Sequence, residues 1–403
     1  MRKKRLLAIL ATGERSRGEL ASELGISSQP WLSRAYLSPL IATAMLTVPA
    51  VSPVGTVVSD TNRYTCGSGC VSSLSPDSRR ILAPYLASET GRGECHDIAA
   101  IADIPVDNPK AARSFVLCRA GELFCGEKVS SVLCYASMVW KGNLRVFLDV
   151  NYREYGWRDW NIATRKVVGE GVYSCRYGGV KKRLSPDAIE EYLTSLAMKD
   201  FNPKKEIGDR CIIQTKPQWM DGAFYGLVTS SCSQPILFKS VDGETLEFVS
   251  AIPAVAQYEC QLAICDGTFY ALMRGASGDN FWTSSDKGLT WKKSGRLPDG
   301  KQRPQLAVHK GSLLVGYSAP DEKPSKVRNG RNNFHLLKGT GCDLTKYREV
   351  LHFLDPIGVV YPDLVDVNGR LCMLWSNSAR FPTFVKWGAV QGKDQILHMW
   401  LIR

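Results

Sequence analysis

A turn motif that recurs through most of the chain constrains the fold more than any other feature. Each copy has a polar residue, a turn glycine and then alternating apolar residues, and the copies begin at Lys141, Asp221, Asp266, Lys310 and Asn368. The glycine provides the positive φ angle of a tight turn, and the alternation is typical of a half-buried strand. The motif therefore predicts a series of hairpins and a chain that is mainly β.

The spacing of these hairpins predicts how they pack. Successive turn glycines are separated by 80, 45, 44 and 58 residues, and 80 is close to two of the shorter units. A period of about 40 to 50 residues built from short strands is typical of the blades of a β-propeller. We therefore predict a propeller of five or six blades over residues 111–403, with a stacked β-sandwich as the alternative.

Two segments interrupt this β pattern. Residues 66–110 show no clear period and are predicted to be a linker or the first strands. An amphipathic helix is expected near 185–198, because Ser185 can cap it and Pro186 suits its first position. We interpret this helix as an insertion in the propeller.

The charge of the chain favours an anionic partner. Lys and Arg outnumber Asp and Glu by 51 to 39, and a surplus of +12 is typical of proteins that bind nucleic acid or an acidic sugar. The 13 cysteines lie mostly in apolar runs, which favours buried reduced thiols over a disulfide framework. Cys66, Cys70, Cys95 and His96 have donor types suited to zinc, but their spacing is not standard. No metal and no cofactor is predicted.

The beginning of the chain imitates a signal peptide without having its length. The basic run Arg2–Arg5 precedes an apolar core of only six residues. The second apolar stretch, residues 37–58, is interrupted by prolines and small polar residues. We therefore predict no membrane span and a cytoplasmic location, with secretion as the alternative.

Residues 1–65 have a helix-turn-helix pattern. A short helix is expected over Leu6–Leu10, a capping box starts a second helix, and a tight turn leads into a third helix with an apolar face. This stretch resembles the small winged-helix module of Fic-family proteins and some RecG-like helicases, with a wing over 46–64. The resemblance implies DNA contact through Gln29, Ser33 and Arg34 of the third helix. The alternative is a protein-interaction or relic module that binds no DNA.

One hairpin carries a more specific pattern. The fixed positions of the motif S-x-D-x-G-x-T-W are filled by Ser284, Asp286, Gly288, Thr290 and Trp291. This motif resembles the Asp box of the sialidase, or BNR-repeat, superfamily, and the resemblance covers residues 134–380. It implies a mainly β chain with a five- or six-bladed sialidase-like β-propeller, here preceded by the small α-rich winged-helix domain. Asp boxes are structural turns away from the active site, so the motif says nothing about catalysis.

The sialidase resemblance also implies catalytic residues. Members of the family use a Tyr nucleophile paired with a Glu, an Asp acid/base and three arginines on the sugar carboxylate. A neutral Tyr avoids the repulsion that a carboxylate nucleophile would meet beside the substrate's own carboxylate. The resemblance assigns the Glu, two of the arginines and the Tyr, in chain order, to Glu259, Arg274, Arg331 and Tyr361. Arg303 and Arg328 are alternative anchors for the anionic substrate.

The upstream part of the chain matches the family less well. The resemblance assigns the acid/base role to Asp159. The first arginine of the family should stand near Tyr135, where no arginine is present, so Arg153 or Arg158 would have to substitute for it. Fewer blades than in a typical sialidase fit between Asp159 and Glu259.

These assignments predict a glycoside hydrolase of sialidase type, exo-acting on an acidic or polar glycan and retaining through a Tyr361 adduct. Ordinary structural roles are the alternative. Glu259 and Arg274 would then form a cross-strand ion pair, while Tyr361 would be a core aromatic and Asp159 would cap a turn. Two other functions remain open: a non-catalytic propeller that binds glycan or protein, and a DNA-binding regulator whose propeller senses a sugar.

Overall fold

The computed structural model describes residues 51–59, 64–66, 71–88, 97–197, 210–230, 234–254, 257–274, 279–298, 303–319, 333–354, 359–376 and 396–402. The chain divides into two units, Met1–Ser52 with Arg403, and Pro53–Ile402. The second unit contains nearly all of the described residues and is mainly β. Within this described part, no helix has the length and apolar character needed to cross a membrane.

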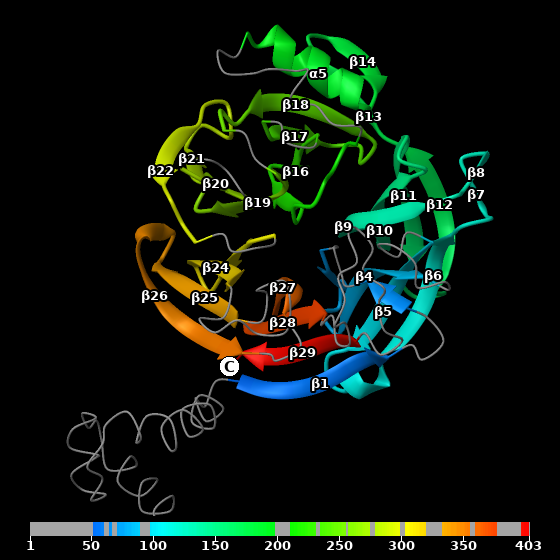
Figure 1. Cartoon of the computed structure of the whole chain (residues 1–403), viewed down its shortest axis with the longest axis vertical. Helices are drawn as coiled ribbons and strands as arrows, with labels where there is room; N and C mark the ends of the chain where they lie inside the picture. Colours follow the sequence, from blue (N-terminus) through cyan, green and yellow to red (C-terminus); the bar gives the residue numbers. More distant parts are fainter. Residues whose placement is uncertain are drawn as a thin grey trace, which may run out of the picture. The chain divides into compact units, whose positions relative to one another are not determined.

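Five sheets are blades that each come from one contiguous stretch of chain (Figure 1). Blade 1 contains β2 (Tyr64–Cys66), β3 (Ser73–Leu74), β4 (Arg80–Ser88), β5 (Ile98–Pro105) and β6 (Arg113–Arg119), with the 3₁₀ turn η2 (Pro109–Ala111) before β6. Blade 2 contains β9 (Val132–Trp140), β10 (Asn143–Val150), β11 (Glu154–Asn161) and β12 (Lys166–Val172). The short hairpin of β7 (Leu123–Phe124) and β8 (Glu127–Lys128) precedes blade 2.

Blade 3 contains β15 (Gln218–Met220), β16 (Ala223–Val228), β17 (Ile236–Ser240) and β18 (Thr245–Ala251), extended beyond β18 by β13 (Ser174–Tyr177) and β14 (Val180–Arg183). Blade 4 contains β19 (Gln257–Cys265), β20 (Thr268–Arg274), β21 (Phe281–Ser284) and β22 (Lys292–Gly295). Blade 5 contains β23 (Gln305–His309), β24 (Ser312–Ala319), β25 (Asn333–Thr340) and β26 (Asp343–Leu354). Residues 66–110 thus supply strands of blade 1, one of the two expectations for that segment.

A further sheet combines the two ends of the unit. It contains β27 (Val360–Val367), β28 (Arg370–Ser376), β29 (Ile396–Ile402) and β1 (Val51–Ser59), in the order β1-β29-β28-β27 (Figure 1). The wing expected over 46–64 is corrected here, because residues 51–59 pair with β29 and so belong to the propeller. The sheets together form the β-propeller that the repeat predicted.

The predicted hairpins are confirmed in every sheet that carries the motif. In each, two residues with positive φ join the first strand to the second, with φ of 46–53° at the polar residue and 68–80° at the glycine. The five turns are Lys141–Gly142, Asp221–Gly222, Asp266–Gly267, Lys310–Gly311 and Asn368–Gly369. Positive φ at both positions is typical of the turn that matches the twist of a two-residue hairpin.

A second kind of turn joins the third strand of a blade to the fourth. Between β21 and β22, Asp286 accepts hydrogen bonds from the Thr290 amide at 3.0 Å and the Ser284 hydroxyl at 2.6 Å. The hydroxyl bonds from Ser284 and Thr290 are the main cause of the lowered pKa of Asp286. The strands that flank this turn are 281–284 and 292–295.

The two kinds of turn meet between neighbouring blades. Since strands in a blade are antiparallel, first-to-second and third-to-fourth turns lie on the same face of the propeller. Lys287 Nζ and Asp221 Oδ2 are 2.7 Å apart between blades 4 and 3. Between blades 4 and 5, Cys265 and Cys342 form a disulfide, which corrects the expectation of reduced thiols for this pair. Seven other described cysteines are free, and six of them are buried, as expected.

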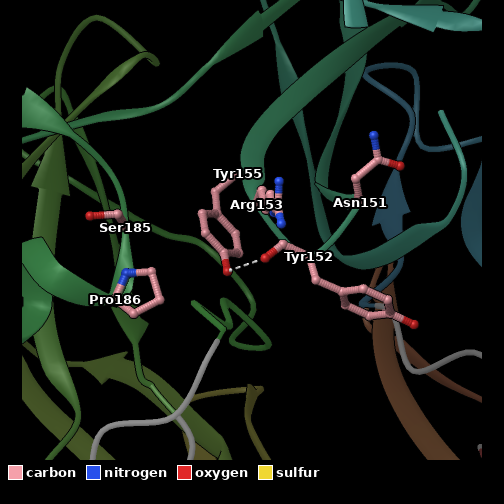
Figure 2. Close-up of a pocket in the computed structure, with 6 residues that line it drawn as sticks. All are labelled: Asn151, Tyr152, Arg153, Tyr155, Ser185 and Pro186. Atoms are coloured by element: carbon pink, nitrogen blue, oxygen red, sulfur yellow. Dashed lines mark hydrogen bonds between the residues drawn. The ribbon is translucent and has the colours of Figure 1, made fainter. Parts of the chain in front are cut away.

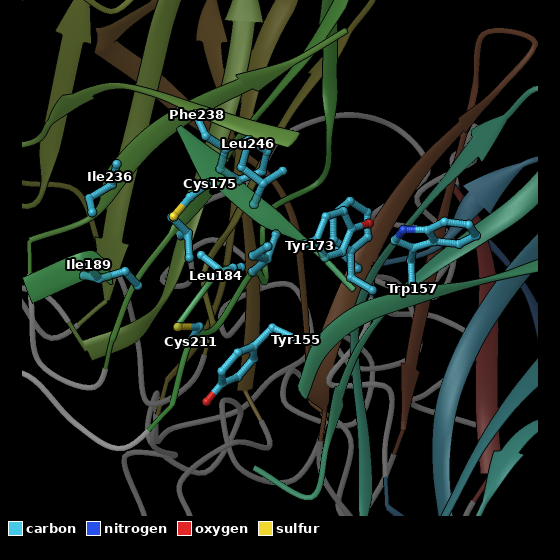
Figure 3. Close-up of a cluster of buried hydrophobic side chains, with 14 of the residues drawn as sticks. Tyr155, Trp157, Tyr173, Cys175, Leu184, Ile189, Cys211, Ile236, Phe238 and Leu246 are labelled. Carbon is cyan, nitrogen blue, oxygen red and sulfur yellow. The ribbon is translucent and has the colours of Figure 1, made fainter. Parts of the chain in front are cut away.

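An apolar cluster fills the space between blades 2 and 3 (Figure 3). The ring of Phe147 stacks on Tyr173 at 5.1 Å, and Phe224 packs edge-on against Phe147. The helix α5 (Pro186–Ser195) covers this cluster and ends slightly before the expected boundary at 198. The hydroxyl of Ser185 caps it by accepting a hydrogen bond from the Ala188 amide at 3.1 Å, which confirms the capping prediction.

Candidate functional site

Two first strands carry bulges at residues predicted to be catalytic. The register of β19 against β20 shifts around Glu259, and the register of β27 against β28 shifts around Tyr361. A bulge inserts an extra residue, bends the strand and re-aims a side chain, and bulges are over-represented next to active sites. These two irregularities therefore single out the beginnings of β19 and β27.

Glu259 is paired with Arg274, at the end of β20. Arg274 Nη1 donates to Glu259 Oε2, and the two side chains are 20% and 4% exposed. A charge-assisted hydrogen bond in such a buried position holds both groups firmly. This contact is the cross-strand ion pair that the sequence offered as the structural alternative, and the catalytic roles of the two residues stay predictions.

The backbone of Tyr361 is strained. Its φ is 47°, in the left-handed region, and the next residue is Pro362, which restricts the conformation of its neighbour further. A bulky residue held in this region costs about 1–3 kcal/mol. Such strain persists where the surrounding structure enforces it, and it gathers at functional sites.

A buried hydrogen bond helps to enforce this conformation. The Ser72 amide donates to Asp363 Oδ2 at 2.8 Å, and both residues are buried. The bond ties the beginning of β27 to blade 1 across 291 residues of sequence. Sequence reasoning missed this pair, since nothing in either local pattern marks it.

The Arg303 guanidinium lies beside the Tyr361 ring, 5.9 Å from the ring centroid. Arg303 precedes β23, which lies next to both β19 and β27, and its side chain is fully buried. Arg303, one of the expected substrate anchors, thus contacts Tyr361. Arg328 and Arg331 lie outside the described residues.

The topology places these groups on one face of the propeller. Glu259, Arg303 and Tyr361 lie at or before the beginnings of first strands, and Arg274 ends a second strand. In antiparallel blades these positions share one face, opposite to the glycine turns. The candidate site therefore consists of Glu259, Arg274, Arg303 and Tyr361, contributed by blades 4 and 5 and the sheet that combines the two ends.

Asp159 lies elsewhere. It is opposite Arg145 in the register of β10 and β11, and the two form a bidentate pair with both N–O distances at 2.7 Å. Arg145 also donates to the Gly243 carbonyl at 2.7 Å and stacks 3.6 Å from the centroid of the Trp157 ring. Gly243 belongs to a third-to-fourth-strand turn, so this pair is near the opposite face. Contrary to the expectation, Asp159 is outside the candidate site.

The blade that contains Asp159 is the second along the chain. The resemblance placed Asp159 in a first blade, whereas residues 64–119 form an additional blade before it. Tyr135, where the family's first arginine was sought, lies in blade 2 and donates its hydroxyl to Asp149 at 3.3 Å. The nearby Asp149 and, above all, burial raise the pKa of Tyr135 well above its ordinary value.

Arg153, one of the two expected substitutes for the missing arginine, lines a pocket of about 530 Å³ (Figure 2). Tyr152, Tyr155 and the beginning of α5 also line it, and the Tyr155 hydroxyl donates to the Tyr152 carbonyl at 3.3 Å. The pocket adjoins the loop between β10 and β11, a second-to-third-strand loop. It therefore lies on the same face as Glu259 and Tyr361.

Arg158, the other expected substitute, has a structural role instead. It is 3.0 Å from Glu122 and 2.9 Å from Glu170, and it donates to the carbonyls of Leu117 and Leu123. These bonds fasten the segment before blade 2 to β11 and β12. These four partners occupy the guanidinium, so it is not available to a substrate.

The remaining predictions from sequence lie outside the described residues. They are the DNA contacts Gln29, Ser33 and Arg34. Cys70, Cys95 and His96, whose donor types suit zinc but for which no metal is predicted, lie outside the described residues as well. DNA binding through residues 1–65 therefore stays a prediction.

No protein-family model and no curated protein sequence matches the chain. Solved structures do match. A protein of unknown function from Dyadobacter fermentans aligns with a TM-score of 0.54 and 10% identity over 88% of this chain and 100% of its own. Trypanosoma rangeli sialidase aligns with a TM-score of 0.55 and 11% identity over 88% of this chain and 60% of its own. The fold is that of a sialidase-like β-propeller.

The same sialidase in complex with sialic acid aligns with a TM-score of 0.53 and 11% identity, over 88% of this chain and 59% of its own. The chain thus spans less than two thirds of the trypanosomal enzyme. At such identity the likeness establishes the architecture only, because one fold hosts many functions. The function of this sialidase-like propeller has to be argued from its own residues.

Proposed function

We propose that this sialidase-like propeller is a glycoside hydrolase that removes a terminal acidic sugar, with Tyr361 as the nucleophile. The observation that carries the proposal is the strained Tyr361, with φ of 47° at a bulge beside the Arg303 guanidinium. A strained aromatic residue inside a strand is costly, and such positions are retained chiefly where they serve a mechanism.

The positive charge of this face supports an acidic substrate. Arg303 lies before β23, Arg274 ends β20, and Arg153 lies in the loop before β11. A guanidinium group binds a carboxylate through paired N–H donors. The formal net charge of +12 also attracts anions over longer distances.

The proposed reaction has two displacements at the anomeric carbon. In the first, Tyr361 Oη bonds to that carbon, the aglycone leaves as its anion, and Glu259 takes the phenolic proton. In the second, water attacks the same carbon and releases a proton to solvent, while Tyr361 leaves and recovers its proton from Glu259. Two inversions give a sugar of retained configuration. An uncharged phenol approaches the sugar carboxylate without the repulsion that a carboxylate nucleophile would meet.

Hydrolysis of a fluorogenic aryl sialoside by the purified chain tests the proposal. We expect turnover that is abolished in Tyr361→Phe and reduced about 10²- to 10⁴-fold in Glu259→Gln, because Gln keeps the size of Glu but accepts no proton. Circular dichroism checks that each variant is folded. Tyr347→Phe, which removes an exposed hydroxyl on β26, is the matched control and keeps wild-type turnover. Undiminished turnover in folded Tyr361→Phe contradicts the assigned nucleophile.

A non-catalytic propeller that binds an acidic glycan is the second candidate. The observation that favours it is the buried ion pair between Asp159 and Arg145. This pair occupies the Asp159 carboxylate, which the resemblance assigns as the acid/base. If the chain is of this kind, it is expected to bind free sialic acid in a calorimetric titration and to hydrolyse neither aryl nor alkyl sialosides. An enzyme without a general acid still cleaves the aryl sialoside, whose leaving group needs no proton.

A further inference from the structure

A separate group of side chains belongs to blade 5. The strands that carry it are the third and fourth of the blade, β25 and β26, which lie side by side (Figure 1). His335 of β25 and His352 of β26 are directly opposite each other in register. Their rings stack with centroids 4.3 Å apart and an interplanar angle of 7°. Nδ1 of His335 also lies 2.7 Å from Glu349 Oε2. The group is therefore two imidazoles and a carboxylate.

A bulge in β26 brings the carboxylate to the same side as the imidazoles. Leu336 is opposite Leu351, but Leu337 is opposite Glu349, so Val350 is the extra residue. In a regular strand, residues three apart point to opposite faces. The extra residue reverses the alternation, and Glu349 consequently shares the face of His352.

The donor atoms of the three side chains all lie within 4.8 Å of one another. Donors bound to one ion at about 2.0–2.2 Å are at most about 4.4 Å apart, so small side-chain rotations suffice to close the group around an ion. We propose that His335, Glu349 and His352 form a binding site for a divalent transition-metal ion on blade 5.

Neighbouring residues orient both imidazoles. Tyr317 of β24 is opposite His335 in register, and the two rings stack at 4.9 Å with an interplanar angle of 11°. Asn333 Oδ1 is hydrogen-bonded to His352 Nε2. Because an amide oxygen only accepts, Nε2 of His352 carries the proton and Nδ1 keeps its lone pair for an ion. Partners of this kind fix the tautomer and ring orientation of metal-binding histidines.

The chemistry of the donors selects the ion. Two imidazoles with one carboxylate suit Zn²⁺, Cu²⁺ or Ni²⁺, whereas Mg²⁺ and Ca²⁺ prefer oxygen ligands throughout. Three protein donors leave coordination positions for water. Since the ligands come from two neighbouring strands, the bound ion cross-links β25 to β26 at the edge of blade 5 and stabilises that pairing.

Calorimetric titration of Zn²⁺ into the full chain, first stripped of metal with a chelator, tests this site. The expected result is loss of one ion per chain, or at least tenfold weaker binding of that ion, in His335→Gln and in His352→Gln. Zn²⁺ is also expected to raise the melting temperature of the wild type and not of these variants. Glu349→Gln changes an exposed side chain, so it preserves folding and still weakens the same binding event.

His309→Gln is the matched control. His309 Nδ1 lies 2.6 Å from Asp366 Oδ2, but this pair belongs to no three-donor group among the residues that the structure describes. Its Zn²⁺ binding is expected to equal that of the wild type. An unchanged isotherm in both His335→Gln and His352→Gln overturns the proposal, as does equal loss in His309→Gln. Titration with Mg²⁺ is expected to give no binding at the site, and binding as tight as that of Zn²⁺ overturns the choice of ion.

Discussion

The Arg303 guanidinium lies 5.9 Å from the centroid of the Tyr361 ring, and the two residues come from neighbouring sheets of the propeller. This contact joins a buried cation to the one aromatic residue that the resemblance assigns as nucleophile. A fixed positive charge stabilises negative charge as it develops on the phenolic oxygen, and it attracts an acidic substrate to the same place. Arg303 is therefore expected to affect both binding and chemistry.

Arg303→Lys is expected to weaken both effects. Lys keeps the charge but loses the planar face and the paired donors of Arg. A desolvated cation–π contact contributes about 2 kcal/mol, so KM for the aryl sialoside should rise, or kcat should fall, by about tenfold or more. Steady-state kinetics measure the change. Arg370→Lys, at an exposed position that begins β28 on the opposite face, is the control and should leave both constants unaltered.

Strain at Tyr361 predicts an unusual order of stability. Tyr361→Gly and Tyr361→Ala remove the same ring, but only glycine adopts φ of 47° without cost. The glycine variant is thus expected to be more stable to urea than the alanine variant by about 1 kcal/mol. Tyr270, in the regular strand β20, should show the opposite order, with glycine less stable than alanine by about 0.5–1 kcal/mol. A Tyr361→Ala protein that is at least as stable as Tyr361→Gly would mean that Tyr361 is not strained.

The pair of Asp159 with Arg145 is expected to matter for stability and not for turnover. Asp159→Asn leaves the Arg145 charge, 3% exposed, without its partner, and breaking such a pair costs about 3–5 kcal/mol. Replacing both, with Asp159→Leu and Arg145→Met together, should cost less than the single change. Urea unfolding measures these differences. A folded Asp159→Asn protein that loses turnover would restore Asp159 to the active site.

The turn around Asp242 predicts a dependence of stability on pH. Burial raises the pKa of Asp242, but hydrogen bonds, chiefly from the amides of Thr245 and Glu244, outweigh it and lower the pKa from 3.8 to about 2. The folded value is below the unfolded one, so the carboxylate stabilises the fold fully above about pH 5. That contribution is lost as the pH falls from 3.8 towards 2.

Urea unfolding of the wild type and Asp242→Asn between pH 7 and pH 2 checks this sign. The stability difference between the two proteins should be constant near neutral pH and shrink below about pH 4. A difference that stays constant to pH 2 would show that the Asp242 carboxylate is not stabilised in the folded state.

Local patterns in the sequence predicted the blades that carry the glycine turn, because the turn requires positive φ angles that only a few residue types readily adopt. Blade 1 was not recognised as a full blade. Its β3 and β4 are joined through the segment from Ser75 to Arg79, which lacks the glycine of the other turns. The resemblance therefore counted the blade that contains Asp159 as the first, although blade 1 precedes it.

The residues of the candidate site could be proposed from the sequence, but their arrangement in space could not. Glu259 and Arg274 lie on adjacent strands, so their pairing follows from a hairpin that local sequence reveals. The bulges in β19 and β27, and the contact of Arg303 with Tyr361, depend on how sheets pack across long stretches of chain. The disulfide of Cys265 with Cys342, separated by 77 residues, was missed for the same reason.

The sheet that joins β1 to β29 has a consequence for how the protein is made. Its partners, Val51–Ser59 and Ile396–Ile402, are separated by nearly the whole propeller, and contacts of such long range form slowly. On the ribosome, blades 1 to 5 can assemble in order as they emerge, but β28 lacks its outer neighbour until β29 has been synthesised. Until then the nascent chain exposes an unpaired strand edge, and chaperones that cover such edges should bind it during translation and release it once the ring is closed.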